Sequence, residues 1–203
     1  MIDKADRHFR TKDGTVYGFT YKGKIYLDPE IATANTAIHE FTHLWAEMMR
    51  QTKPEEWQSI TSAMKSKEMA PLWNEIINNP AYKGLTEDEI AEEVLATYTG
   101  REGEQLLDKW MQKIDRETPN LKDREVAKRA IDKLRDILNR FWEFVCKLLG
   151  KEHVYKHPKM IQYAVMRDLF NGVNPNNAIS QQNSNVRMQA EAEKISSNPL
   201  AGS

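Results

Sequence analysis

Apolar residues recur with a helical period along most of the chain. From Ala34 to about Arg50 they fall at positions 34, 37, 38, 41, 44, 45, 48 and 49, which predicts a helix with one wide buried face. The same period predicts further helices over residues 54–67, 69–78, 86–100, 103–117, 122–149 and about 158–171. Thr86 and Glu89 have the spacing of a capping box, which marks the start of the helix over 86–100.

A different pattern near the N-terminus predicts a β-hairpin over residues 15–28. Val16, Phe19 and Tyr21 are β-formers, residues 22–24 read Lys-Gly-Lys and suit a turn, and 25–27 form a short second strand. The expected fold class is therefore α+β, predominantly α-helical, with a small N-terminal β-hairpin or sheet. Beyond residue 174 large apolar groups are few, so we expect one domain over 1–173 and a disordered tail or linker over 174–203.

Composition adds little about partners. The chain has 29 basic and 30 acidic side chains and a formal net charge of -1, so no global field favours nucleic acid or a membrane surface. Segment 121–151 is mildly basic, a pattern more typical of a solvated helix face than of a nucleic-acid site. Without a signal peptide or a membrane-length apolar run, the chain is expected to be cytoplasmic, with no membrane partner. The sole cysteine, Cys146, excludes a disulfide framework and a cysteine-rich zinc site.

The candidate chemistry lies in the segment 37–45, which contains the pattern His-Glu-x-x-His. On a helix that turns about 100° per residue, His39 and His43 point about 40° apart, so both imidazoles can reach one ion, with Glu40 beside them. Two neutral imidazoles suit Zn²⁺, and a catalytic zinc takes three protein ligands and leaves one position for water. We expect Glu40 to accept a proton from that water as it attacks a carbonyl. The apolar residues of this helix lie opposite His39, so one face is expected to pack and the other to bind metal.

The third ligand is expected to be a carboxylate of the helix over 86–100, since no third histidine follows at the spacing of the longer zinc motifs. Glu92 is the poorest choice, because it projects away from the apolar stripe of that helix. Glu93 and Glu89 lie one turn apart at the edge of the stripe. One of them can bind zinc while the other orients a ligating histidine.

Resemblance to known families adds to this reasoning. Residues 93–98, Glu-Val-Leu-Ala-Thr-Tyr, are similar to the Glu-Gly-Phe-Ala-x-Tyr stretch of gluzincin aminopeptidases, in which the first Glu binds zinc; the resemblance favours Glu93 as the third ligand. The wider pattern over 15–175 resembles the zincin-like metallopeptidase domains embedded in large polyvalent proteins of bacterial phages and conjugative elements. It is carried by residues 23–29, the His-Glu-x-x-His helix, 89–96 and 167–175.

The resemblance implies a zinc metallopeptidase domain, with the rest of a larger parent polypeptide as an expected partner. It does not imply aminopeptidase specificity. The chain has 49 residues between His43 and Glu93, which departs from the aminopeptidases, and it lacks a Gly-Ala-Met-Glu-Asn-type substrate motif.

Four side chains are candidates for stabilising an oxyanion, because each can donate a hydrogen bond: Tyr98, Tyr82, His153 and His157. In zincins, a peptide substrate pairs with the edge strand that precedes the motif helix, and residues 25–27 are candidates for that strand. The expected function is a zinc endopeptidase acting on an extended polypeptide. The alternative is a non-catalytic, zinc-binding interaction or structural module of a mobile-element protein, which would have no use for a base such as Glu40.

Overall fold

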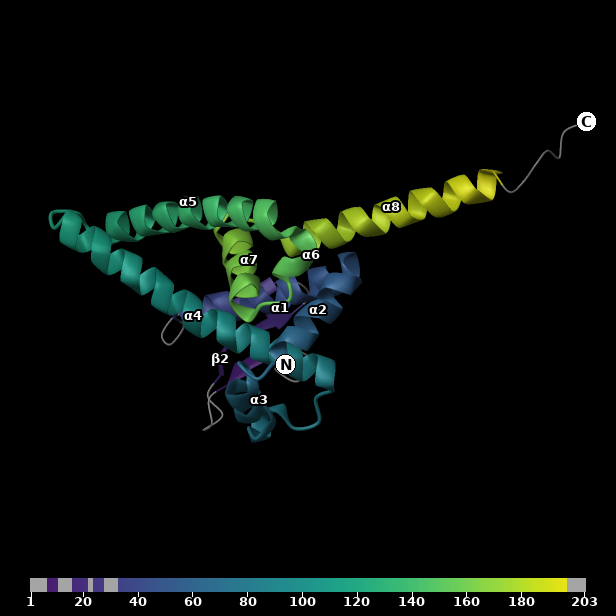
Figure 1. The fold of residues 1–203 in the computed structure, drawn as a ribbon, viewed down its shortest axis with the longest axis horizontal. Coiled ribbons are helices and arrows are strands. Elements are labelled where there is room, and N and C mark those ends of the chain that lie inside the picture. The colour runs from purple at the N-terminus through teal and green to yellow at the C-terminus, as the bar shows by residue number, and fades with distance from the viewer. Residues whose placement is uncertain (1–6, 11–15, 22–23, 28–32, 197–203) are drawn as a thin grey trace, which may run out of the picture.

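The computed structural model describes residues 7–10, 16–21, 24–27 and 33–196, and helices dominate it (Figure 1). The helices are α1 (Ala34–Thr52), α2 (Pro54–Met64), α3 (Ala70–Ile77), α4 (Glu87–Glu117), α5 (Asp123–Leu149), α6 (Lys151–Val154), α7 (Pro158–Phe170) and α8 (Pro175–Ser196). A short 3₁₀ helix, η2 (Pro80–Tyr82), connects α3 to α4. Most of these helices begin and end close to the predicted boundaries, because prolines and capping residues mark their ends.

The described strands belong to one small antiparallel sheet. Strands β1 (Arg7–Arg10), β2 (Val16–Tyr21) and β3 (Lys24–Leu27) have the order β1-β2-β3, so β3 lies at one edge among the described strands. Phe19 pairs with Tyr26 across β2 and β3, and with His8 across β1 and β2. Strand β1 was not predicted from the sequence. Residues 22 and 23 of the predicted turn lie outside the described residues.

The predicted α+β fold class is wrong, because the described architecture is helical. Both hydrophobic clusters among the described side chains are built from helices and the turns beside them, with α1, α2, α4 and α7 supplying most of the larger one. The strands hold only four, six and four residues. Long helices with wide apolar faces can bury those faces against one another, and the three short strands contact α1 beside them.

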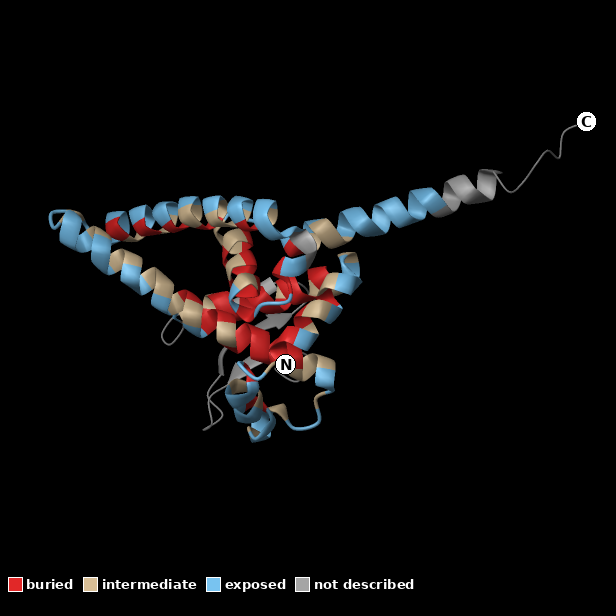
Figure 2. Ribbon diagram, in the orientation of Figure 1, coloured by how far each residue is buried: buried red, intermediate tan, exposed pale blue. Residues whose placement is uncertain are grey.

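Helix α1 lies at the centre of this core and packs along the first half of α4 (Figure 2). The two helices run antiparallel: the backbone N–H of Asn35 donates to Glu104, whereas Arg50, at the other end of α1, pairs with Asp88. The close approach depends on a glycine. A Cβ added at Gly100 would lie 2.4 Å from Asn35 Oδ1, which is too close for any larger residue without a shift.

Helix α4 is one continuous helix where the sequence predicted two, over 86–100 and 103–117. The predicted break lay near Gly100 and Gly103. Both glycines sit inside the helix against α1 and neighbouring side chains, so they provide close packing and do not end the helix.

The C-terminal segment is helical where a disordered tail or a linker was predicted. Helix α8 packs Ala178 and Ile179 against the main core and then projects away from it (Figure 1). Its Ala, Gln, Glu and Met residues are good helix formers, and Pro175 suits a first helical position, so a polar composition is compatible with a helix here. None of the described helices has both the length and the apolar character needed to cross a membrane.

Candidate metal centre

Three buried side chains converge where α1 crosses α4. His39, His43 and Glu93 each offer one ligand atom, and these atoms all lie within 4.8 Å of one another. The Nε2 atoms of the two histidines are 3.1 Å apart, and each is 3.7 Å from a carboxylate oxygen of Glu93. The three residues are at most 3% exposed. This cluster could hold a metal ion, as the spacing of the two histidines predicted.

Local sequence fixes both helices that carry the cluster. Thr33 caps α1, and its hydroxyl accepts a hydrogen bond from the backbone N–H of Thr36. Thr86 caps α4 in a capping box with Glu89, whose carboxylate accepts from the backbone N–H of Thr86. Each cap lies within two turns of a candidate ligand, so the caps stabilise the first turns of both helices close to the site.

Glu92 orients His43, although its position on the helix made it the poorest choice of third metal ligand. Its Oε1 accepts a hydrogen bond from His43 Nδ1 at 2.7 Å, which turns Nε2 of the same ring toward the cluster. Glu92 is only 2% exposed. Its ranking as the poorest metal ligand agrees with the geometry, since its atoms are not among those that converge, but the expectation that it points away from the core is wrong, because α1 covers that face.

Glu89 forms the capping box with Thr86 that its spacing predicted. The described contact that orients a ligating histidine comes from Glu92. The other part of the prediction, Glu93 as the carboxylate that meets both histidines, agrees with the geometry. The two faces predicted for α1 are both present, since Phe41 and Trp45 lie in the main core while His39 and His43 face Glu93, and the face that carries the histidines is buried as well.

Glu40 is fully buried beside the cluster, and neither of its carboxylate oxygens has a hydrogen-bond partner among the described residues. Burial raises the pKa of Glu40 to about 7, with the charge of Glu93 adding to the rise and that of His43 opposing it. A carboxyl group with a pKa near neutrality and free oxygens is suited to gain and release a proton.

The two histidines differ in their electrostatic surroundings. Burial and the neighbouring charge of His43 hold the pKa of His39 well below its usual value, which favours a neutral ring. Burial also acts to lower the pKa of His43, but Glu93 and Glu92 outweigh it and raise that pKa to about 9. A metal ion would therefore have to displace a proton from His43 in order to bind.

Of the four candidate oxyanion stabilisers, only Tyr82 has a described interaction with this site. Burial raises the pKa of Tyr82, and the charges of Glu93 and Glu40 raise it further, so its hydroxyl stays protonated and able to donate. The phenol packs against the main core from η2. Arg101 also acts on Tyr82, from an ion pair with Glu75 at 2.5 Å.

The other three candidates lie elsewhere. Tyr98 is half-buried, and its pKa is raised to about 12 by burial and by charges outside the cluster, first that of Glu102. His153 and His157 are exposed, and no described contact joins either to the cluster. Exposure of these two histidines agrees with their position around a helix break.

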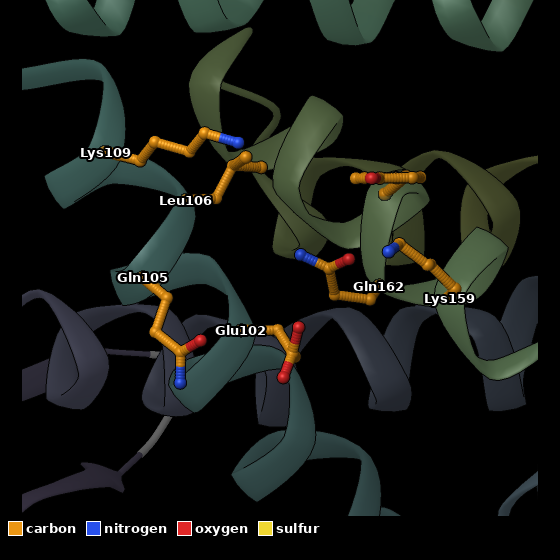
Figure 3. A pocket seen from close by; sticks show the side chains of 7 residues that line it. Glu102, Gln105, Leu106, Lys109, Lys159 and Gln162 are labelled. Atoms are coloured by element: carbon orange, nitrogen blue, oxygen red, sulfur yellow. The ribbon is translucent and has the colours of Figure 1, made fainter. Parts of the chain in front are cut away.

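A surface pocket of about 220 Å³ lies between α4 and α7 (Figure 3). Its lining is polar and mixed in charge: Glu102, Gln105, Leu106, Lys109, Lys159, Gln162 and Tyr163. None of the three candidate ligands, nor Glu40 or Tyr82, contributes to it. The pocket therefore does not open onto the candidate metal centre.

Comparison with known proteins does not assign a function to the site, so its function is argued from its chemistry. No protein-family model, curated protein or solved structure matches the chain.

The raised pKa of Glu40 predicts a pH-dependent stability in the metal-free protein. Unfolded Glu40 releases its proton near pH 4.5, whereas the folded protein retains it until about pH 7. The proton thus stabilises the folded state fully below pH 4.5, and this stabilisation is lost as the pH rises to about 7. Thermal unfolding of chelator-treated protein should show the melting temperature falling, relative to that of Glu40→Gln, across this interval. Parallel curves for the two proteins would contradict the raised pKa.

Proposed function

We propose that the domain is a zinc metallopeptidase that hydrolyses an extended polypeptide, with His39, His43 and Glu93 as zinc ligands and Glu40 as the general base. The observation that carries the proposal is the convergence of two imidazole Nε2 atoms and one carboxylate beside the buried Glu40, whose oxygens have no hydrogen-bond partner among the described residues. This donor set, two His and one Glu, leaves one tetrahedral position open, which is typical of catalytic zinc sites.

The spacing of the ligand atoms supports zinc. Tetrahedral bonds of about 2.0 to 2.1 Å place neighbouring ligand atoms about 3.3 Å apart. The corresponding distances here are 3.1 Å between the two Nε2 atoms, 3.7 Å from His39 Nε2 to Glu93 Oε2 and 3.7 Å from His43 Nε2 to Glu93 Oε1. With one carboxylate oxygen as the ligand, the three ligand atoms all lie within 4.8 Å of one another, so the Glu93 carboxylate would move closer to the two histidines on binding zinc.

Each neighbouring group has a task in peptide hydrolysis. When bound, zinc would supply Lewis-acid polarisation of the scissile carbonyl and would acidify a water molecule. Glu40 takes up the proton of the attacking water and later delivers it to the leaving amine. The Tyr82 hydroxyl, held protonated by burial and by the charges of Glu93 and Glu40, donates a hydrogen bond toward the developing negative charge. Glu92 keeps the ring of His43 turned toward the cluster.

A non-catalytic zinc-binding module is the second candidate function. Full burial of the three ligands would suit a structural site. Glu40 argues against it, since a buried carboxyl group without a hydrogen-bond partner among the described residues destabilises the fold and contributes nothing to a structural site.

The proposal predicts about one zinc ion per chain after reconstitution, because the described residues form one such three-ligand cluster. Zinc that binds the folded but not the unfolded chain also stabilises it, so a chelator should lower the melting temperature. Metal analysis and thermal unfolding, with and without chelator, test both points. The proposal fails if the reconstituted protein holds no zinc.

Cleavage of a degenerate peptide library, again with and without chelator, separates the two candidate functions. A metallopeptidase should cleave the library only in the metal-loaded state. Stoichiometric zinc without any cleavage would favour the structural module.

A further inference from the structure

Beyond the cluster, a chain of polar contacts leads from His43 to the protein surface. Glu92 contacts His43 through Oε1, while its Oε2 accepts a hydrogen bond from Arg50 Nη2 at 2.6 Å. Arg50 Nε donates to Asp88 Oδ2 at 3.1 Å, and Trp57 Nε1 donates to Asp88 Oδ1 at 2.8 Å. The contacts connect α1, α4 and α2.

The guanidinium of Arg50 is itself held in a fixed orientation. It lies 4.7 Å from the ring centroid of Trp57, within the range of a cation–π contact. Asp88 holds its Nε side and Glu47 its Nη1, at 2.5 Å, which leaves Nη2 directed at Glu92. Arginine is suited to this arrangement, because its planar fork can serve several carboxylates in set directions.

Glu92 needs this partner because of its burial. A carboxylate that is 2% exposed is strongly destabilised unless both oxygens are paired. His43 satisfies one oxygen and Arg50 the other. Without Arg50, the second oxygen would lose its cationic partner, and Glu92 would no longer be held in the orientation that His43 requires.

We propose that Arg50 is a positioning residue of the metal centre, acting through Glu92 to hold the His43 ring in its ligating orientation. This inference rests on the proposed zinc function. It makes Arg50, whose described partners include none of the three candidate ligands, part of the site. The sequence offered no signal for it, because Arg50 lies at the end of α1, where a basic residue is ordinary.

The test is a double-mutant cycle of Arg50→Gln and Glu92→Gln, in which the zinc affinity of each variant is measured by competitive Zn²⁺ titration. Loss of a partner that orients a ligand typically lowers metal affinity by about 10 to 100-fold, and Glu92→Gln should fall in this range. Arg50→Gln should lower the affinity by about 10-fold. If Arg50 acts through Glu92, the zinc affinity of the double variant should match that of Glu92→Gln alone, because Arg50 has no further effect once Glu92 is changed.

Two further variants separate positioning from general stability. Glu55→Gln makes the same chemical change at an exposed side chain of α2 that has no role in the site, and it should leave zinc affinity unchanged. Arg50→Lys keeps a cation for Glu92 but gives up the fork to Asp88, so it should retain most of the zinc affinity that Arg50→Gln loses.

The possible outcomes distinguish this inference from the proposed function. If the wild-type chain binds no zinc, both are overturned. If the wild-type chain binds zinc but the fold-losses of zinc affinity of Arg50→Gln and Glu92→Gln multiply in the double variant, Arg50 acts independently of Glu92. The positioning role is then overturned, while the proposed zinc function stands. The same holds if Arg50→Lys loses as much affinity as Arg50→Gln.

Discussion

Replacing Glu40 with glutamine is expected to remove peptide hydrolysis while the zinc and the fold remain. The amide is nearly isosteric with the carboxyl group, and it cannot take up a proton from water. General acid–base catalysis typically contributes about 10² to 10⁴-fold, so the rate should fall by at least two orders of magnitude. Steady-state cleavage of a peptide found in the library screen, with zinc content measured on the same samples, provides the test.

The geometry explains why zinc should survive this change. Glu40 is not among the three residues whose ligand atoms converge, and its oxygens make no hydrogen bond to the described residues. Glu55→Gln is a matched control, because it makes the same chemical change at an exposed side chain of α2 that has no role in the site. The control should cleave like the wild type. Equal turnover by Glu40→Gln and the control would mean that Glu40 is not the base.

Helical periodicity predicted most helices near their observed bounds, but it misjudged what glycine does in α4. A sequence pattern treats Gly100 and Gly103 as a break, since glycine is a poor helix former. In the structure each faces a close neighbour, Asn35 Oδ1 at Gly100 and the Met166 side chain at Gly103. Packing between helices that are distant in sequence thus decides the role of these glycines, and periodicity within one segment carries no information about it.

The candidate site was predictable where it depends on one helix. The spacing of His39 and His43 brings their rings together on any α-helix, and Glu93 followed from the apolar stripe of α4 together with a family resemblance. The contact of Glu92 with His43 was not predicted, because the surroundings of Glu92 depend on a second helix. From α4 alone it faces away from the apolar stripe; in the fold that direction holds His43 and Arg50.

The fold class failed for a related reason. An alternating pattern identifies strands, but it does not tell how much of the core they build. Here the described core belongs to helices, with α1 buried on every side over residues 38–43. That burial also places both histidines where desolvation and neighbouring carboxylates govern their charge.

Replacing Glu93 with alanine should weaken zinc binding far more than replacing Glu89 in the same way. Glu93 meets both histidine Nε2 atoms at 3.7 Å, so its loss removes a direct bond to the metal. The loss of a group that only orients a ligand typically costs about 10 to 100-fold in affinity, and Glu93→Ala should exceed that range. Competitive zinc titration of the two variants measures the difference.

Glu89→Ala should instead affect the stability of α4. Its carboxylate accepts hydrogen bonds from the backbone N–H and the hydroxyl of Thr86, at 2.8 and 2.9 Å. Loss of such a cap typically lowers the free energy of unfolding by about 1 kcal/mol. The two variants should therefore differ in kind, one losing the metal and the other lowering the melting temperature of the metal-free chain. If Glu89→Ala released the zinc while Glu93→Ala kept it, the third ligand would have to be sought nearer the start of α4, and the resemblance to the aminopeptidases would have misled the assignment.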